Sequence, residues 1–552
     1  MLSVLDFFIF LTSAVICIIL VPVVAKLSIR VGGIDTPDDR KIHTQAISRL
    51  GGVAIFSSLL FTIIFFCEID QQLKGILSGA IIIFLTGLAD DLTNLTPRQK
   101  FAGEFAAAGL AVFMGGICVT DLGDPFGIGI LELGPFAVPF TLIGIVGVIN
   151  AINLLDGLDG LASGVCTIAS TSFMILAYQS DNTILFPLSI AILGSLIGFF
   201  IYNNYPAQIF MGDSGSLLLG YFMGCFSVMV VSSGESRVSP YIPLIILGVP
   251  ILDTVTVMVN RKRTGKKLFL PDNTHLQHRL LGLGIGHKYA VLIVFGLSYL
   301  LSIIGIAGQY ASDSVLLLVS TLIYSVVYSL LYSLKSRGWY FKQDLSSNQS
   351  LQSTAMHQAL VRYSGNLAII IKLLVVAILL LPLLLSKGDV RLLPVIPLVL
   401  LIMLAVIYLR KTSWQNNVLQ AFIYSAGAFI ILIIENFGRN DLILGFPLLK
   451  YSHGLFLLLL VFAGIKILLR KRVIKLLGSP FEYLIMFIVL SIPLMPATFT
   501  ASYYLVAVAA KSVILFVGFK LVLSEEKQQN RYIIMAITAA LLGLTVRSLL
   551  EF

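Results

Sequence analysis

The stretch Ile149–Gly164 reads INAINLLDGLDGLASG and lies where one long apolar segment ends and the next begins. Two asparagines and two aspartates recur in it at three-residue steps, namely Asn150, Asn153, Asp156 and Asp159. This spacing places side chains along one ridge of a helix and its frayed end. Ionisable groups at the edge of a membrane span are costly, and they usually mark function. We therefore interpret the stretch as the floor of an active site rather than as a loop of ordinary turn residues.

The composition around this stretch excludes a soluble domain. The 552 residues are 58% hydrophobic and only 12% charged, with a mean hydropathy of +0.97. Apolar runs of about 20 residues, the length of a helix that crosses a bilayer, recur from end to end. These features predict an all-α, polytopic integral membrane protein. The five cysteines form no CxxC pair, so they indicate neither a disulfide framework nor a metal site.

The apolar runs predict about eleven spans before residue 335 and about seven after residue 364. The first group lies near 4–26, 51–68, 73–90, 101–119, 137–154, 161–178, 184–202, 215–232, 241–259, 289–308 and 314–334. The second group lies near 366–385, 392–409, 418–435, 453–469, 481–499, 503–523 and 532–550. We expect domain 1–334 to carry the chemistry, 335–364 to be a polar cytoplasmic linker, and 365–552 to be an accessory membrane domain.

Basic residues alternate between the loops. Lys and Arg are frequent in 26–50, 98–100 and 260–288, whereas 69–72, 179–183 and 309–313 hold none. The positive-inside rule then places the N-terminus outside and the basic loops in the cytoplasm, with the polar motifs on the cytoplasmic face of the cell's inner membrane. The net charge of +9 is explained in this way and does not indicate a nucleic-acid partner.

Three further aspartates stand beside span ends. Asp90 and Asp91 close a span in GLADDLTNLTPRQK, which ends at Lys100, and Asp213 lies in GDSG just ahead of another span. Carboxylates at a membrane surface suit a hydrated Mg²⁺ or a proton-accepting role, and a nearby lysine suits a phosphate. Two negative charges at a helix C-terminus oppose the helix dipole, which argues for function against a solvated pair. For Asp213 the alternative is a helix N-cap.

Two basic segments are candidates for contact with a phosphate. They contain Arg40, Lys41, His43 and Arg49 in DTPDDRKIHTQAISRLGG, and His275, His278 and Arg279 in DNTHLQHRL. The first segment could instead be only an orientation signal. In the second, no Cys or further His accompanies the two histidines, which argues against zinc and favours His and Arg facing a diphosphate.

Taken in this order, the motifs resemble those of the polyprenyl-phosphate N-acetylhexosamine-1-phosphate transferases, which include the bacterial undecaprenyl-phosphate GlcNAc-1-phosphate transferases. The match runs from the N-terminus to about residue 335 and rests on five motifs. The resemblance implies that domain 1–334 transfers a sugar 1-phosphate from a UDP-N-acetylhexosamine to undecaprenyl phosphate in the lipid bilayer, releasing UMP. It also implies Mg²⁺, or Mn²⁺, as cofactor, and the first membrane step of a cell-surface glycan pathway.

The same resemblance assigns roles to individual positions. The residues implied to act in catalysis are Asp90 and Asp91 of the acidic pair, the phosphate-binding Lys100, Asp156 and Asp159 of the NxxDGxDG motif, and His275. The residues implied to bind substrate are Arg40, Lys41, His43, Arg49, Asn150, His278 and Arg279. The residues implied to hold the metal are Asn153 and Asp213. Gln277 stands where the family usually has a histidine, which leaves the nature of the sugar open.

Two other functions are alternatives to this one. A phospho-N-acetylmuramoyl-pentapeptide transferase carries a triple-His run, and HLQHRL is closer to the GlcNAc type. A transporter or flippase would favour ionisable residues at mid-span, whereas these gather at span ends. Because every motif precedes residue 290, we expect a chain that ends near Ser346 to keep most of its activity. The C-terminal part would then serve oligomerisation, for example as a homodimer, or contact with a pathway partner.

Overall fold

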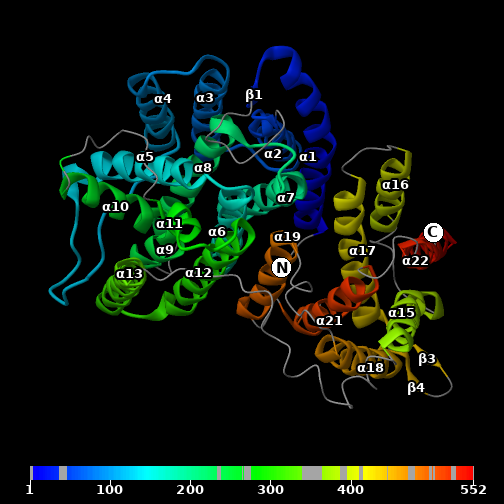
Figure 1. Ribbon diagram of the computed structural model, residues 1–552. Helices are drawn as coiled ribbons and strands as arrows, with labels where there is room; N and C mark the ends of the chain where they lie inside the picture. The colour runs from blue at the N-terminus through cyan, green and yellow to red at the C-terminus, as the bar shows by residue number, and fades with distance from the viewer. Residues whose placement is uncertain are drawn as a thin grey trace. The chain divides into compact units, whose positions relative to one another are not determined.

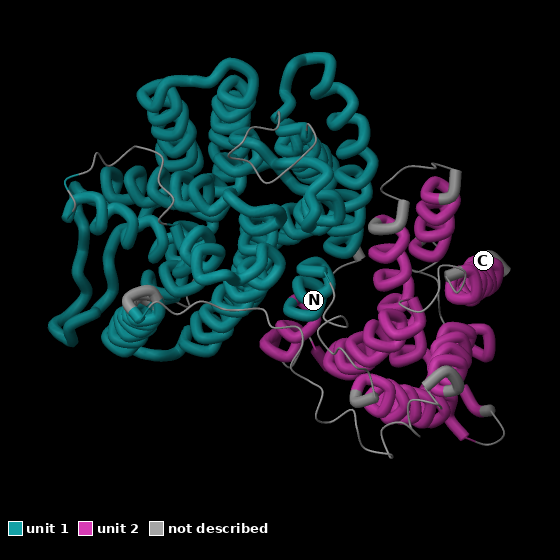
Figure 2. The backbone as a smooth tube through the Cα atoms, viewed as in Figure 1, with its two compact units in different colours: residues 1–342, 479–487 teal, residues 343–478, 488–552 magenta. Residues whose placement is uncertain are grey.

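The computed structural model describes residues 4–35, 47–232, 238–263, 265, 275–337, 364–385, 395–409, 415–439, 441–443, 446–469, 479–496, 500–501, 504–523 and 530–550. The chain forms two compact units, shown in different colours in Figure 2. Unit 1 comprises residues 1–342 and 479–487, and unit 2 comprises residues 343–478 and 488–552. Every residue that the sequence assigned to the site falls within the bounds of unit 1.

The helices of unit 1 follow the apolar runs (Figure 1). They are α1 (Val4–Val31), α2 (Gly51–Phe66), α3 (Gln71–Thr93), α4 (Pro97–Gly109), α5 (Ala137–Leu155), α6 (Leu161–Gln179), α7 (Leu185–Asn203), α8 (Gly212–Ser232), α9 (Tyr241–Ile246), α10 (Gly248–Arg263), α11 (Leu276–Gly282), α12 (His287–Ala307) and α13 (Asp313–Ser336). A π-helical turn (Leu110–Met114) extends α4, and the antiparallel pair β1 (Ile34–Asp35) and β2 (Ile47–Ser48) follows α1. Helices α6, α7 and α8 are the most deeply buried, so they form the centre of the unit.

Length and composition confirm the predicted class. In the described parts of the chain, eleven helices are long and apolar enough to cross a membrane, and four shorter apolar helices accompany them. The two pairs of two-residue strands add almost no sheet. The protein is therefore an all-α, multi-pass membrane protein.

Proline explains two differences from the predicted spans. The run 241–259 folds as two helices, α9 and α10, instead of one. Pro250 lies in the first turn of α10, where its missing N–H is harmless, but it could not continue α9 because its ring would meet the carbonyl four residues earlier. The run 481–499 forms a shorter helix, α19 (Pro480–Ser491), and a 3-10 turn that contains Pro493.

Unit 2 is a second bundle of apolar helices. Its helices are α15 (Ser364–Leu380), α16 (Val395–Leu409), α17 (Gln415–Phe437), α18 (Leu448–Leu469), α21 (Leu505–Leu523) and α22 (Asn530–Leu550), with the end of α19 and the strand pair β3 (Leu442–Ile443) and β4 (Phe446–Pro447). Lys511 of α21 donates to buried Glu435 of α17, and its ammonium lies 3.0 Å from Ser452 Oγ of α18. This ionic cluster ties three helices together.

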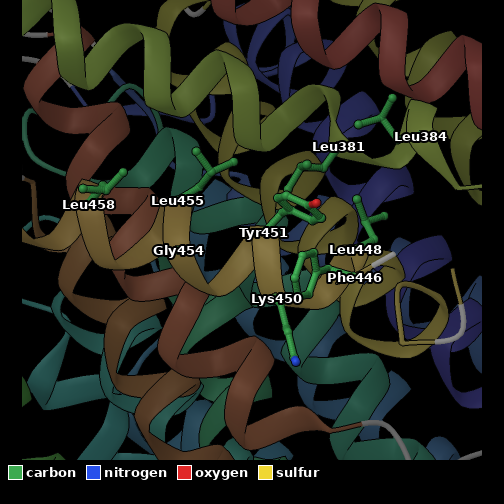
Figure 3. Close-up of a pocket in the computed structure, with 9 residues that line it drawn as sticks. All are labelled: Leu381, Leu384, Phe446, Leu448, Lys450, Tyr451, Gly454, Leu455 and Leu458. Carbon is green, nitrogen blue, oxygen red and sulfur yellow. The ribbon is translucent and has the colours of Figure 1, made fainter. Parts of the chain in front are cut away.

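Unit 2 also contains an apolar pocket of about 520 Å³ (Figure 3). Its lining comes from α18, which contributes Leu455 and Leu458, and from the turn of chain that follows α15, which contributes Leu381 and Leu384. Lys450 is the one charged residue in its lining, and no sequence-predicted site residue contributes to it.

Candidate active site

A lysine between two carboxylates forms the centre of the site. Lys100 Nζ donates to Asp213 Oδ2 at 3.0 Å and forms an ion pair with Asp90. Asp90 ends α3, Asp213 begins α8, and Lys100 lies in the first turn of α4. That turn is fixed locally by a capping box between Thr96 and Gln99. The sequence thus brings three elements together around one ammonium group.

Asp91 has a different task from Asp90. Its two carboxylate oxygens accept the backbone N–H groups of Asp213 and Ser214, at 2.8 and 2.9 Å. Gly212 permits this approach, because its φ of +67° favours glycine and a Cβ there would lie 2.6 Å from Asp91 Oδ2. Asp91 therefore caps α8 from another helix, and the Asp213 carboxylate is left to contact Lys100.

The motif between α5 and α6 is held from two sides. Asn153 Oδ1 accepts a hydrogen bond from Ser216 Oγ of α8 at 2.7 Å. Asp159 Oδ2 accepts from Ala207 N, in the loop that follows α7, at 2.9 Å. Gly160 then starts α6 with a left-handed φ of +74°. These contacts fix the turn that carries Asp156 and Asp159 against the start of α8.

Negative charge exceeds positive charge at this turn. Burial is the main reason that the pKa of the Asp156 carboxyl is raised to about 7, and nearby carboxylates contribute. These are Asp213, Asp91 and Asp159. Burial lowers the pKa of Lys100, but Asp213 and Asp90 outweigh it and raise that pKa above its usual value. A desolvated site with surplus carboxylate charge suits a cation.

The donor set fits Mg²⁺ in particular. In the described part of the chain, no group of three His, Cys, Asp or Glu side chains is arranged to enclose a metal ion. Mg²⁺ does not need such a cage, because it binds through one or two carboxylates and completes its shell with water and substrate phosphates. Asp213 and Asp156 offer the hard oxygen ligands that this ion prefers.

A histidine is oriented beside the turn by a residue that the sequence analysis missed. Asp253 Oδ2 lies 2.7 Å from His275 Nδ1, and Asp253 Oδ1 accepts from Leu276 N at 2.6 Å. Because a carboxylate only accepts, Nδ1 carries the hydrogen and the other ring nitrogen remains available. Asp253 lies inside the predicted span 241–259, and a carboxylate in a span could have identified it. Burial, aided by His275 and opposed by Asp253, lowers the pKa of His278.

Gln277 packs against the motif turn. The side chain is 1% exposed, and its amide nitrogen donates to the Leu154 carbonyl at 3.2 Å. The same nitrogen lies 3.1 Å from the position a Cβ would take at Gly157. Gln277 therefore joins α11 to the end of α5.

Asn150 makes its contacts one turn deeper in α5. Its amide nitrogen donates to Glu104 Oε2 at 2.6 Å and to the Val146 carbonyl at 3.0 Å, so both amide hydrogens are used within the protein. Glu104 is 1% exposed and was not predicted. Its position four residues after Lys100 on α4 places the two on one helix face, which was the available signal.

The structure describes only some residues of the two basic segments. Arg49 Nε lies 4.0 Å from Asp35 Oδ1, and the Arg49 carbonyl lies beside Gly212 at the start of α8. Arg279 lies in the last turn of α11. The predicted Arg40, Lys41 and His43 lie outside the described residues. The structure thus gathers the acidic motifs, Lys100, Arg49 and the His275 loop in unit 1.

Comparison with known proteins shows the family to which the chain belongs. Residues 73–231, which include Lys100 and Asp213, match the model for glycosyl transferase family 4. Over 304 residues the chain is 35% identical to a protein of Bacillus subtilis (strain 168) named "probable undecaprenyl-phosphate N-acetylglucosaminyl 1-phosphate transferase". That alignment covers 55% of this chain and 85% of the relative. The chain belongs to glycosyl transferase family 4.

Other relatives of this family 4 glycosyltransferase are similar over a comparable length. It is 31% identical over 316 residues to the decaprenyl-phosphate N-acetylglucosaminephosphotransferase of Mycolicibacterium smegmatis, covering 52% of this chain and 77% of the relative. It is 25% identical over 293 residues to the undecaprenyl-phosphate alpha-N-acetylglucosaminyl 1-phosphate transferase of Escherichia coli K12, covering 52% and 79%. The family inferred from the motifs is thereby confirmed.

Proposed function

We propose that the protein transfers N-acetylglucosamine 1-phosphate from UDP-N-acetylglucosamine to undecaprenyl phosphate, giving undecaprenyl-diphospho-N-acetylglucosamine and UMP. The observation that carries the proposal is Lys100 between Asp90 and Asp213, beside the desolvated Asp156. Such a site suits a diphosphate that arrives with a divalent cation. The three relatives, whose names all specify N-acetylglucosamine and a polyprenyl phosphate, support the choice of substrates.

The proposed reaction is a displacement at phosphorus. An oxygen of the lipid phosphate attacks the phosphorus that bears the sugar. The bond from this phosphorus to the oxygen that bridges it to the uridine-linked phosphate breaks, and UMP leaves with that oxygen. A phosphate monoester has a second pKa near 6, so the nucleophile is largely dianionic at neutral pH. The main task of the protein is therefore to align the two phosphates and to neutralise their charge.

The residues of the site divide this task. Lys100 would hold a phosphate oxygen, and the imidazolium form of His275, with its Nδ1–H held by Asp253, would donate from Nε2 to the diphosphate. Asp213 and Asp156, with Asn153 beside them, would hold Mg²⁺, or Mn²⁺ in its place. When bound, the ion neutralises charge on the diphosphate as it develops. Asp91 binds two backbone N–H groups at the start of α8, and it would thereby fix the position of Asp213 relative to Lys100.

A UMP-release assay tests the proposal. The purified full chain in nanodiscs is given undecaprenyl phosphate, Mg²⁺ and, one at a time, UDP-N-acetylglucosamine, UDP-N-acetylgalactosamine, UDP-glucose and UDP-N-acetylmuramoyl-pentapeptide. We expect UMP from the N-acetylhexosamine donors only, and none when the lipid is omitted or EDTA is added. Efficient turnover of the muramoyl-pentapeptide donor, or UMP from none of the four, would overturn the proposal.

We further propose that the site opens to the cytoplasm of a cell with the N-terminus outside. The support is the charge asymmetry, since the loop around Gly265 is basic and the loop around Ile128 holds no Lys or Arg. An epitope inserted after Gly265 should react with antibody only in permeabilised cells. An epitope after Ile128, which is 84% exposed, should react in intact spheroplasts. The opposite pattern would reverse the topology.

A further inference from the structure

A short sequence late in the chain fixes the start of a helix. Ser479–Glu482 reads SPFE, with proline at the first helical position and glutamate two residues later. The backbone N–H of Ser479 donates to Glu482 Oε2 at 3.1 Å, which is the glutamate half of a capping box. The helix α19 therefore begins at a defined residue, and this places Phe481 in its first turn.

The start of α19 belongs to unit 1, although the residues before and after it belong to unit 2. Residues 479–487 are coloured with unit 1 in Figure 2. The Phe481 ring, 6% exposed, stacks on Phe200 of α7 with ring centroids 6.0 Å apart and planes 20° apart. The Phe487 ring stacks on Tyr299 of α12, at 4.7 Å and 14°. Two aromatic contacts thus hold α19 in the catalytic unit.

The partner of Phe481 touches the motif turn directly. Phe200 is fully buried, and a Cβ at Gly160 would lie 3.0 Å from its Cε2 atom. Gly160 closes the turn that carries Asp156 and Asp159. On another side Phe200 meets Phe295 of α12, with centroids 6.1 Å apart. A continuous path of packed groups therefore runs from Phe481 through Phe200 to Gly160.

We propose that Phe481 is a positioning residue for the active-site turn 156–160. It confines the Phe200 ring against Gly160, and the backbone at Gly160 sets where the carboxylates of Asp156 and Asp159 lie. Interiors are close-packed, so a ring removed at Phe481 lets Phe200 tilt away and frees the turn. A displacement of about 1 Å at reacting groups costs on the order of a hundredfold in rate. The inference uses UMP release as its activity readout, and in that respect it rests on the proposed function.

The test compares two phenylalanines of the same helix segment. Phe481→Ala and Phe487→Ala each remove a ring that stacks within unit 1, but Phe481 stacks directly on the ring that meets Gly160, whereas Phe487 stacks on Tyr299 of α12. We expect Phe481→Ala to lower kcat about tenfold or more, with the KM for UDP-N-acetylglucosamine within about twofold. Phe487→Ala should keep kcat within about threefold of wild type. Phe481→Leu, which refills most of the space, should recover much of the lost rate.

A second readout does not depend on catalysis. Backbone amide exchange of the 150–165 segment, followed by mass spectrometry, should be faster in Phe481→Ala than in wild type and in Phe487→Ala. Wild-type protein without UMP release would count against the proposed function alone, since the exchange comparison remains. Equal losses of kcat in both alanine variants, or unchanged exchange at the turn, would overturn the positioning role. If Phe481→Ala does not fold, Phe481→Val against Phe487→Val, which fill less of the ring space than leucine does, applies the same criteria.

Discussion

At the scale of single residues, the ammonium of Lys100 provides the charge balance of the site. It contacts Asp90 and Asp213, two of the five aspartates of the proposed site. A desolvated carboxylate without a partner would be costly, so Lys100 makes the arrangement stable before any substrate arrives. An incoming Mg²⁺ ion must then compete with the Lys100 ammonium group for the Asp213 carboxylate. Mg²⁺ is therefore expected to exchange readily and not to be required for folding.

Asp213→Asn should abolish UMP release, to below about 1% of wild type, because one charge is lost from the proposed metal ligands and from the partner of Lys100. The fold should persist, since Asp91 binds the backbone N–H of residue 213, which asparagine retains. UMP release at saturating Mg²⁺ and thermal unfolding measure the two effects. Asp181→Asn, an exposed aspartate at the far end of α6, is the matched control with full activity expected. An Asp213→Asn enzyme with a tenth of the wild-type rate would contradict the assignment.

The raised pKa of Asp156 makes a prediction for pH. Folded protein holds the Asp156 proton up to about pH 7, whereas the unfolded chain releases it near 3.8. Between these values the unfolded state binds fewer protons, so stability falls as the pH rises, by at most about 4 kcal/mol. We expect the Tm in EDTA to decline over this window in wild type and to decline less in Asp156→Asn. Parallel curves for the two proteins would show that Asp156 titrates normally.

At the scale of elements, the cap of α8 is supplied from outside α8. Asp91→Ala should destabilise the protein by about 1–3 kcal/mol, because two N–H groups at the start of a buried helix lose their acceptor. Asp91→Asn keeps one acceptor oxygen and should retain measurable UMP release.

The matched control for this cap is Asp70→Ala at the other end of α3. Asp70 caps that helix through the Leu73 N–H at 2.7 Å, far along α3 from Asp90. Asp70→Ala should lower the Tm by about as much as Asp91→Ala does, and it should leave kcat unchanged. Equal activity in Asp91→Ala and Asp70→Ala would mean that the position of α8 does not matter for turnover.

The helices also show which parts of the fold can be predicted from the sequence. Apolar length predicts where helices such as α3, α5 and α8 lie, because a span must bury its backbone polar groups within itself. It does not predict the break before Pro250, since a mean over a window averages out one residue. The motif residues could be predicted by type and spacing. The different roles of Asp90 and Asp91 could not be predicted. They depend on which of the two carboxylates contacts the start of α8, and α8 is distant in sequence.

Asp253 and Glu104 show the same limit at the site. Each is a single acidic residue in a mainly apolar segment, without the repetition that made Asp156 and Asp159 conspicuous. Their significance comes from partners that are distant in sequence, His275 for Asp253 and Asn150 for Glu104. Local patterns identify the groups that can react, whereas the groups that orient them are defined by packing.

At the scale of the whole molecule, unit 1 includes a late part of the chain, residues 479–487, and we expect activity to depend on it. The sequence alone predicts that a chain ending near Ser346 stays active, but this chain lacks Phe481. We therefore expect it to lose about tenfold or more of its UMP release even when it elutes as a folded species in size-exclusion chromatography.

A protease site inserted after Ser346 of the full chain distinguishes two effects of truncation. One is the loss of residues 479–487, and the other is the break in the backbone after Ser346. Cleavage there leaves both pieces in the membrane, with residues 479–487 still available to unit 1. The cleaved protein should keep most of its activity. A fully active truncated chain, or a cleaved protein as inactive as the truncated one, would contradict this account.

The place of residues 479–487 in unit 1 also sets a time order for biogenesis. A ribosome adds roughly 5–20 residues per second, so the NLLDGLDG turn enters the membrane on the order of tens of seconds before Phe481 is made. During that interval Phe200 lacks its stacking partner. A nascent or prematurely terminated chain would then hold its motif residues without the packing that aligns them. Consumption of scarce lipid carrier would begin only after translation has passed the helices that follow the linker.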